Sequence, residues 1–310
     1  MDDFPTPPVA ATFRPEVAGS ALPAAAVRAE SFGAVAARRF LRHRPAVAGL
    51  VVLLLIALAA ALAPALSPHD PYALDPTAFG APPSAAHPFG TDAVGRDVLS
   101  RLLYASRVSL LVGVSAVAIN VVLGTLLGGI AGWAGGAVDA AIMRVTDMVL
   151  AFPLLMLILV LVSVLGPGLT NVVLVLGLLG WPQVARLVRA EVLRLKQQEF
   201  VTAARAIGCR GPRILFLHLL PNAFAPVLVT ATFLTAQAIV IEASLSFLGM
   251  GVQPPTPSWG NLLTDAQSMA VLEQMPWLWA PAGALTVLAV LSINFVGDGL
   301  RDALDPRLKL

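Results

Sequence analysis

Charged residues and cysteine are scarce in this chain of 310 residues. Only 12% of the residues are charged and 57% are hydrophobic, whereas about a quarter of the residues of a soluble protein are charged. The mean hydropathy of +0.82 is typical of a protein that lies in a lipid bilayer. A single cysteine, Cys209, excludes an internal disulfide and a cysteine-cluster metal site.

Lysine is also nearly absent, which excludes the commonest ATP-binding motif. Neither Lys196 nor Lys309 follows a glycine, so the chain has no Gly-Lys loop to hold a nucleotide phosphate. The histidines lie in predicted loops or at the edges of apolar stretches, where they form no intramembrane protease pair: His43, His69, His87 and His218. We therefore expect no catalytic, cofactor or metal site.

Long apolar stretches are what the sequence has in abundance. A helix needs about 20 apolar residues to cross a bilayer, because no water is there to satisfy its backbone. Six stretches qualify, at residues 46–66, 108–133, 148–165, 171–185, 223–250 and 276–296. The fourth is thinned by Gly177, Gly180 and Pro182. The predicted fold is an all-α membrane protein with six transmembrane helices.

The distribution of positive charge predicts the orientation. If the amino terminus lies inside, the inside segments are residues 1–45, 134–147, 186–222 and 297–310, and they hold 17 of the 20 Lys and Arg residues. Because Lys and Arg favour the cytoplasmic side, both termini are predicted to be cytoplasmic. The predicted parts are a tail, a first span, an external segment, a transmembrane core and a second tail: 1–45, 46–66, 67–107, 108–297 and 298–310.

The first span has an alternative interpretation as a signal peptide. Four arginines precede its apolar run, and Ala61-Leu62-Ala63 resembles a cleavage site. The run is longer than a usual signal core and lies far from the start of the chain, so we favour a retained helix. In the second span, Gly124, Gly128 and Gly132 share one face, which predicts close packing against another helix.

The loop between the fourth and fifth spans, residues 186–222, is the most informative polar segment. Phe200, Ala203, Ala204 and Ile207 recur at helical spacing, and Gly208 predicts a left-handed helix stop. A second short helix is predicted to begin at residues 211–212 and to end before residue 221. The residues alone leave two alternatives open, an ordinary surface loop and a docking site for another protein.

This loop resembles the signature of the integral membrane permeases of ABC importers. Their motif is Glu-Ala-Ala, three residues, Gly, nine residues, Ile, one residue and Leu-Pro. The same spacing occurs here at Thr202-Ala203-Ala204, Gly208, His218 and Leu220-Pro221. Thr202 replaces Glu and His218 replaces Ile, which puts the need for those two side chains in doubt. The ending His218-Leu219-Leu220-Pro221-Asn222 is similar to the peptide and nickel branch of the family.

Three further stretches resemble the C-type permease subunit of that branch, at residues 87–101, 242–260 and 297–306. The resemblance implies a type I importer fold whose loop 186–222 couples to ATPases. The implied partners are a sister permease, two ATPase subunits, an external solute-binding protein and the lipid bilayer, with no nucleic acid. The implied function is import of dipeptides or oligopeptides, and ATP is hydrolysed by the partner subunits.

Three questions stay open at this point. The main alternative is that the same architecture imports nickel or another small solute. A more distant alternative is a non-transporting scaffold or receptor subunit. Glu242 stands out as a carboxylate inside a span, near the outer end of the fifth. A buried carboxylate is costly, so it marks either a pore residue or a structural polar group.

Overall fold

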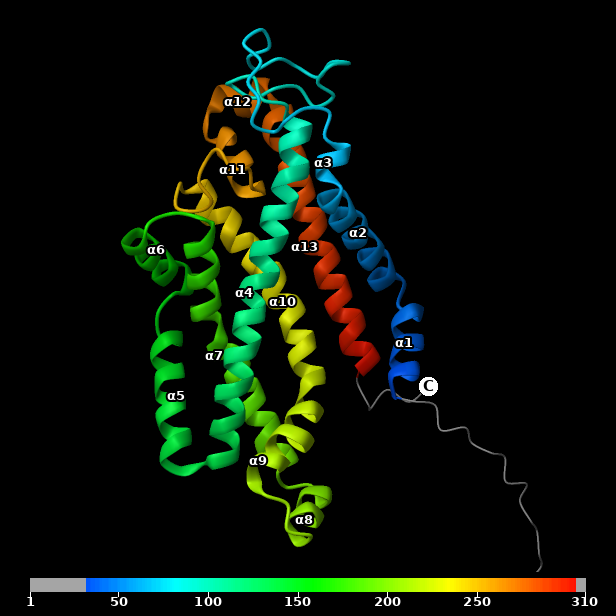
Figure 1. The fold of residues 1–310 in the computed structure, drawn as a ribbon, viewed down its shortest axis with the longest axis vertical. Helices are drawn as coiled ribbons and strands as arrows, with labels where there is room; N and C mark the ends of the chain where they lie inside the picture. The colour runs from blue at the N-terminus through cyan, green and yellow to red at the C-terminus, as the bar shows by residue number, and fades with distance from the viewer. Residues whose placement is uncertain (1–31, 305–310) are drawn as a thin grey trace, which may run out of the picture.

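The computed structural model describes residues 32–304, and they form an elongated bundle of helices (Figure 1). The helices are α1 (Phe32–Arg42), α2 (Arg44–Ala61), α3 (Ala63–Leu66), α4 (Val98–Ala134), α5 (Gly136–Leu150), α6 (Leu154–Leu165), α7 (Leu169–Leu195), α8 (Glu199–Ala206), α9 (Gly211–Ile214), α10 (Leu220–Phe247), α11 (Trp259–Leu263), α12 (Met269–Gln274) and α13 (Pro276–Leu304). A π-helical turn, η1 (Leu215–Leu219), joins α9 to α10, and a 3₁₀ turn, η2 (Thr264–Gln267), precedes α12.

Most of the predicted spans are present as long apolar helices. Within residues 32–304, five helical segments are long and apolar enough to cross a membrane: Arg44–Ala61, Val98–Ala134, Leu169–Leu195, Gly211–Phe247 and Pro276–Leu304. They correspond to the predicted first, second, fourth, fifth and sixth spans. The chain is a multi-pass, all-α membrane protein, and the sixth crossing depends on how α5 and α6 are counted.

The predicted third span differs from the structure. Residues 148–165 do not form one helix, because α5 and α6 meet at an angle of 87°. Pro153 lies at the break, and proline disfavours helix at the residue before it. Residues 136–147 were expected to lie in a cytoplasmic loop but belong to α5. The pair makes one crossing only if it is a broken span.

Three other helix boundaries differ from the prediction. The helix α4 begins ten residues before the predicted span, because the Asp97 side chain caps it by accepting a hydrogen bond from the Ser100 N–H. The helix α7 continues through Pro182 to Leu195, beyond the predicted end at residue 185. The predicted stop before Pro221 is absent, since Pro221 lies in the first turn of α10, where a missing N–H is tolerated.

The glycine face of α4 packs against α7 as predicted. A Cβ atom added at Gly124 would lie 2.5 Å from Val184 Cβ, and one at Gly128 would collide with the Ala185 carbonyl. At Gly132 the distance to the Arg189 carbonyl oxygen would be 2.9 Å. The absence of side chains therefore brings the two helix backbones together over two turns.

The structure describes only part of the two predicted tails. Residues 1–31 lie outside the described residues, and so does the predicted tail beyond residue 304, whereas 32–42 form α1.

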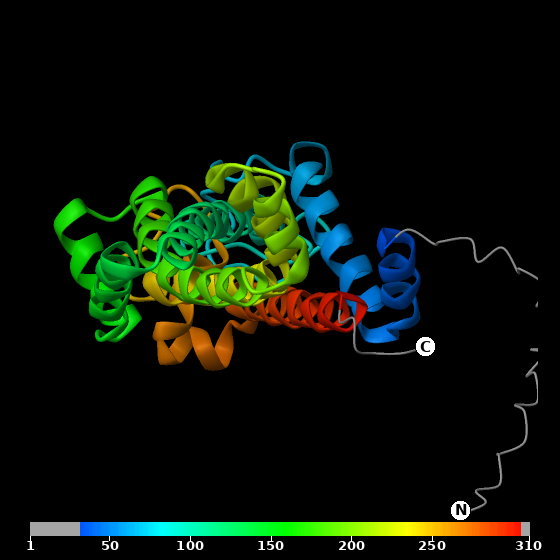
Figure 2. The same ribbon diagram turned by 90° about the horizontal axis from the view of Figure 1, so that it is seen from below.

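The helix α2 packs on α13, where a Cβ atom at Gly49 would lie 2.7 Å from the Ser292 carbonyl oxygen. Seen from below, α1 and α2 lie at one side of the bundle and the green α5 and α6 at the other (Figure 2).

Candidate functional site

One end of the bundle carries the loop of residues 186–222, and we call it the loop end. The helix α8 and the turn after it form the tip of this end (Figure 1). Gly208 has φ +81°, as the sequence predicted for a left-handed stop, and the Cys209 N–H donates to the Ala204 carbonyl. Apart from its chain neighbours, no described atom lies within 4 Å of a Cβ position at Gly208. The turn is therefore open to the surroundings.

A tryptophan at the end of α4 holds this loop in place. The Lys196 ammonium donates to the Trp133 carbonyl at 2.7 Å and lies 5.2 Å from the centre of its ring. The Arg205 guanidinium lies 5.4 Å from the same ring centre. Val201 is fully buried and packs in the core cluster that includes Ile214. The tip of the loop is thus fixed to the transmembrane bundle rather than free to move alone.

The apolar face predicted for this helix points outward. Ile207 is 81% exposed and Phe200 is 42% exposed. Thr202, Ala203 and Gly208 are exposed, whereas Ala204 is half-buried. In the second half of the motif, Pro221 is exposed, and His218 and Leu220 are half-buried. All seven predicted loop residues are therefore at least partly exposed, and the exposed apolar side chains of Phe200 and Ile207 lie on the same short segment as the small ones.

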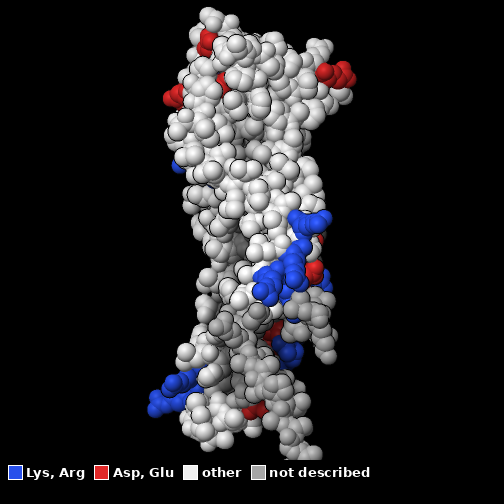
Figure 3. Space-filling view, turned by 90° about the vertical axis from the view of Figure 1, so that its right-hand side faces the viewer, with Lys and Arg blue, Asp and Glu red and all other residues white. Residues whose placement is uncertain are grey.

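Basic residues gather in the same half of the molecule. On the face shown in Figure 3, Lys and Arg lie mainly over the lower half, together with some acidic groups, whereas the upper end shows acidic groups only. Arg189 also joins α7 to α5 through two hydrogen bonds to the Asp139 carboxylate, at 2.5 and 2.6 Å. Such paired bonds fix two helices in orientation as well as in distance. The distribution of charge in Figure 3 thus distinguishes the two ends of the bundle, and the Arg189–Asp139 pair holds α5 against α7.

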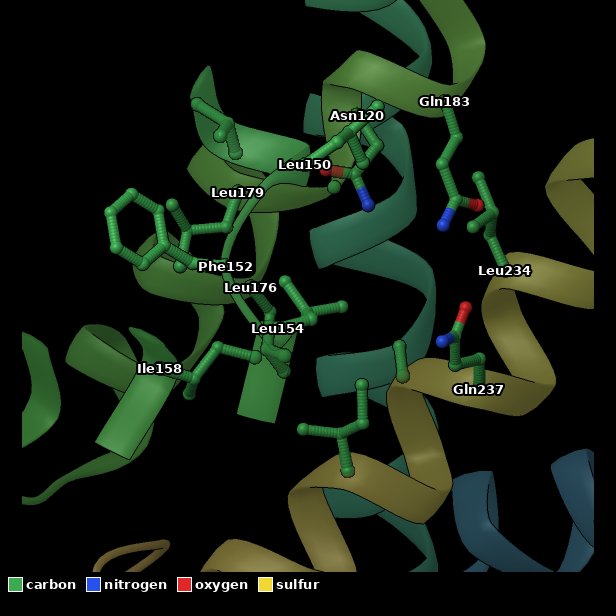
Figure 4. Close-up of a pocket in the computed structure, with 14 residues that line it drawn as sticks. Asn120, Leu150, Phe152, Leu154, Ile158, Leu176, Leu179, Gln183, Leu234 and Gln237 are labelled. Atoms are coloured by element: carbon green, nitrogen blue, oxygen red, sulfur yellow. The ribbon is translucent and has the colours of Figure 1, made fainter. Parts of the chain in front are cut away.

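Three amide side chains from three different helices line a cavity in the middle of the bundle. Asn120 on α4, Gln183 on α7 and Gln237 on α10 lie among mainly apolar neighbours. Figure 4 shows the amide ends of Gln183 and Gln237 directed toward each other. Asn120 is buried, and its Oδ1 has no hydrogen-bond partner among residues 32–304. With a volume of about 50 Å³, the cavity has room for a few water molecules but not for a peptide.

A larger groove adjoins this cavity and shares Gln237 with it. The groove has a volume of about 550 Å³ and lies between α6, α10 and α13, where Ser244 and Asn294 add polar groups to an apolar lining. Small-molecule sites in proteins usually have volumes of about 300–1,000 Å³. Polar groups in apolar spans commonly face a bundle interior or a water-filled path. The groove is thus a candidate surface for a solute path.

Glu242 does not line either of these spaces. Its side chain is fully buried and accepts hydrogen bonds from Ser246 Oγ at 2.7 Å and from Ser109 Oγ at 3.2 Å. Ser109 in turn accepts a bond from the Trp259 N–H, and the Trp259 ring donates to Ser106 Oγ. This network ties α10 to α4 and α11, an environment that favours the structural alternative over the pore alternative.

The opposite end of the bundle carries a cap, formed by residues 67–97 together with α11, η2 and α12 (Figure 1). Arg96 pairs with Asp92 at 2.7 Å, and the buried Arg101 lies 3.6 Å from the same carboxylate. These three side chains line a cavity of about 340 Å³ in the cap, and Asp265 lines it too. Burial raises the pKa of Asp265, and the nearby Asp92 raises it further. The cap thus has its own charged cavity.

The apolar spans make the chain a membrane protein, and the outward-facing apolar patch on its fixed polar loop is a surface that another protein can cover. The chain belongs to the family of binding-protein-dependent transport system inner membrane components, whose model matches residues 124–310. The model of the N-terminal TM domain of oligopeptide transport permease C matches residues 31–83. Together these matches cover the first span and most of the predicted transmembrane core.

Relatives in several bacteria support the same assignment. The chain is 47% identical over 274 residues to a putative peptide permease protein of Brucella suis, a match covering 88% of this chain and 91% of the relative. It is 42% identical to the di/tripeptide transport system permease protein DppC of Pseudomonas aeruginosa, over 87% and 90% of the two chains. The dipeptide permease DppC of Alkalihalophilus pseudofirmus is 41% identical, over 86% and 88%.

Sequence reasoning missed the three amides around the central cavity. Asn120 lies within the predicted second span, Gln183 within the fourth and Gln237 within the fifth. Inside the spans, only charged side chains marked a candidate polar site, and amide side chains carry no charge. A search of the apolar stretches for Asn and Gln as well as for charged residues would have found all three, because amides are also costly in a bilayer without partners.

Proposed function

We propose that this chain is the membrane-spanning permease subunit of an ATP-driven importer for dipeptides or oligopeptides. The family assignment supports a binding-protein-dependent transport system, and the relatives' names support a peptide as the solute. The observation that carries the coupling role is the exposed tip of the loop end, where Ile207 and the open Gly208 turn face outward on a loop fixed to the bundle.

The proposed partners follow from that surface and from the missing phosphate loop. Two ATPase subunits dock at the loop end of this chain and of a sister permease, and an external solute-binding protein delivers solute at the cap. Both termini then lie in the cytoplasm with the Lys- and Arg-rich half, as the positive-inside rule favours. ATP is hydrolysed in the partner subunits, and this chain carries out no covalent chemistry.

The proposed mechanism is alternating access. When the ATPases close on ATP, they displace α8, and the contacts of Trp133 with Lys196 and Arg205 transmit the movement to α4. The bundle then opens outward, and the solute passes along the groove that Gln237 lines. An amide side chain both donates and accepts hydrogen bonds, so it suits the backbone of peptides that differ in their side chains.

Replacement of Gly208 tests the coupling role. Gly208→Glu adds a carboxylate to the docking surface, where an unpaired desolvated charge costs several kcal/mol. It also places a side chain at positive φ, which costs about 1–2 kcal/mol. We expect normal abundance in the membrane, loss of peptide transport and reduced co-purification of the ATPases. Gly208→Ala shares the backbone strain without the charge and is the matched control, with ATPase binding largely retained.

Two outcomes would count against this role. Normal transport by Gly208→Glu with its ATPases still bound would remove the loop from the coupling mechanism. Equal loss of ATPase binding in both variants would show that backbone strain alone explains the defect. Thr202→Ala should be mild in the same assay, because Thr202 already replaces the family's Glu.

Nickel or another small solute is the second candidate for the same architecture. The relatives named for peptides favour the peptide. Substrate choice in such systems depends largely on the external binding protein, so its purified form decides the question. A peptide retained by the cognate binding protein supports the proposal, whereas a retained nickel complex supports the second candidate.

A further inference from the structure

Three side chains with metal-ligating atoms meet in the cap, although they are distant in the sequence. His69 follows α3, His87 lies in the loop of the cap, and Asp97 is the N-cap residue of α4. Asp97 Oδ1 lies 3.0 Å from His87 Nδ1 and 3.8 Å from His69 Nδ1. All three ligand atoms lie within 4.8 Å of one another. The sequence predicted no metal site, because the single cysteine excludes a cysteine cluster and the histidines lie in predicted loops or at the edges of apolar stretches.

The distances are close to those that a tetrahedral metal ion requires. Zinc binds imidazole nitrogen and carboxylate oxygen at about 2.0–2.2 Å, which places two ligand atoms about 3.3 Å apart. The two contacts of Asp97 Oδ1, at 3.0 and 3.8 Å, lie on either side of that value. The two imidazole nitrogens lie within 4.8 Å of each other, so the His69 ring must turn toward His87 for all three atoms to surround one ion.

Neighbouring groups already orient the ligands. Asp97 Oδ2 accepts hydrogen bonds from the Ser100 N–H at 2.8 Å and Oγ–H at 2.7 Å, which leaves Oδ1 facing the two rings. His87 Nε2 lies 3.7 Å from Asp75 Oδ2, the position of the carboxylate that fixes a metal-bound histidine through its other nitrogen. Thr77 donates two hydrogen bonds to Asp75 Oδ1, from its N–H at 2.8 Å and from its hydroxyl at 2.6 Å, which hold this carboxylate in place.

Access to this cluster is from one side. The His69 side chain is 41% exposed, whereas those of His87 and Asp97 are 10% and 1% exposed. An ion can therefore enter from the solvent past His69 and keep a water molecule in its fourth position. Two imidazoles and one carboxylate suit borderline divalent ions such as Zn²⁺ and Ni²⁺ better than Ca²⁺ or Mg²⁺, which prefer oxygen ligands.

We propose that His69, His87 and Asp97 form a binding site for a divalent transition-metal ion, with Zn²⁺ as the best fit. A bound ion would tie the segment after α3 and the loop of the cap to the first turn of α4. The site is independent of the proposed coupling function, since it lies at the opposite end of the bundle from α8 (Figure 1).

Metal titration of the full-length chain tests this site. The protein is purified in detergent without a histidine tag, in a Cys209→Ser background that removes its single thiol. Zn²⁺ binding is measured by calorimetry, and Co²⁺ is added separately because its absorption spectrum reports coordination geometry. We expect one Zn²⁺ per chain and a tetrahedral Co²⁺ spectrum that Zn²⁺ displaces.

Variants identify the ligands. His69→Ala removes an exposed ligand, so the fold is expected to survive and the affinity to fall at least about 100-fold, beyond the 10–100-fold typical of losing an outer partner. Asp75→Asn should weaken binding about 10–100-fold. His218→Ala, at the other end of the bundle, is the matched control and should bind as the parent does.

The overturning results are equally specific. Absence of saturable Zn²⁺ binding in the parent would show that the contacts are only hydrogen bonds between His and Asp. Binding that His69→Ala leaves unchanged would place the ion elsewhere in the chain. A His218→Ala variant that loses binding would do the same.

Discussion

The two ends of the bundle treat polar and apolar groups in opposite ways. Next to the cap, a fully buried carboxylate, Glu242, is satisfied by serine hydroxyls that also bind Trp259. At the loop end, Ile207 is exposed and the Gly208 turn lies open. The hydrogen bonds of one region are complete within the described residues, and the other presents a surface that no part of residues 32–304 covers.

This difference supports the proposed docking of a partner at the α8 loop. If the α8 loop lies outside the bilayer, as proposed, its exposed apolar groups gain free energy only when another protein covers them. The buried network gains nothing from a partner, because its polar groups are already paired. Substitutions should therefore affect stability at the Glu242 network and assembly at the α8 loop.

The largest expected effect on stability comes from Glu242→Ala. It leaves the Ser109 and Ser246 hydroxyls with fewer partners and creates a cavity, which together cost on the order of 3–5 kcal/mol. We expect a melting temperature in detergent lower by roughly 10 °C or more and less protein in the membrane. Glu242→Gln keeps an acceptor oxygen and should lose much less.

Each outcome of the Glu242 pair is informative. An unchanged melting temperature in Glu242→Ala would refute the structural role of the network. A Glu242→Gln variant that is stable but transports no solute would instead assign the carboxylate to transport, in favour of the pore alternative.

A smaller loss is expected from Trp259→Phe. The substitution keeps an aromatic ring in the buried position but removes the indole N–H that donates to Ser106 Oγ at 3.1 Å. The loss of one hydrogen bond and a little packing costs about 1–2 kcal/mol. Thermal unfolding should shift by a few degrees, with ATPase co-purification unchanged. Reduced ATPase binding would contradict the separation of the two regions.

The sequence was sufficient for the features that depend on local chemistry. Apolar length identified five of the spans, and the requirement of a left-handed turn for glycine identified the stop at Gly208. The glycine face of α4 was predicted because helical spacing alone decides which residues share a face. The position of the signature loop followed from its motif.

The missed bend has a local signal in Pro153, whereas the other missed features depend on tertiary packing. The 87° bend between α5 and α6 replaces a span that hydropathy alone continues through Pro153. The convergence of Asn120, Gln183 and Gln237 depends on how three helices pack, which no single stretch of sequence shows. For the same reason, the hydroxyl partners of Glu242 and the cluster around His69 could not be derived from spacing.

Thiol labelling of a cysteine at position 207 tests the central claim most directly. In a Cys209→Ser background, Ile207→Cys and Ser84→Cys are compared, because both positions are exposed in the isolated chain. In intact cells an impermeant thiol reagent should label Ser84→Cys in the cap but not Ile207→Cys. In inverted membranes, position 207 should react at least about tenfold faster after the ATPases are stripped away. Labelling of position 207 from outside intact cells, or equal rates with and without the ATPases, would contradict the proposal that α8 is the cytoplasmic docking surface.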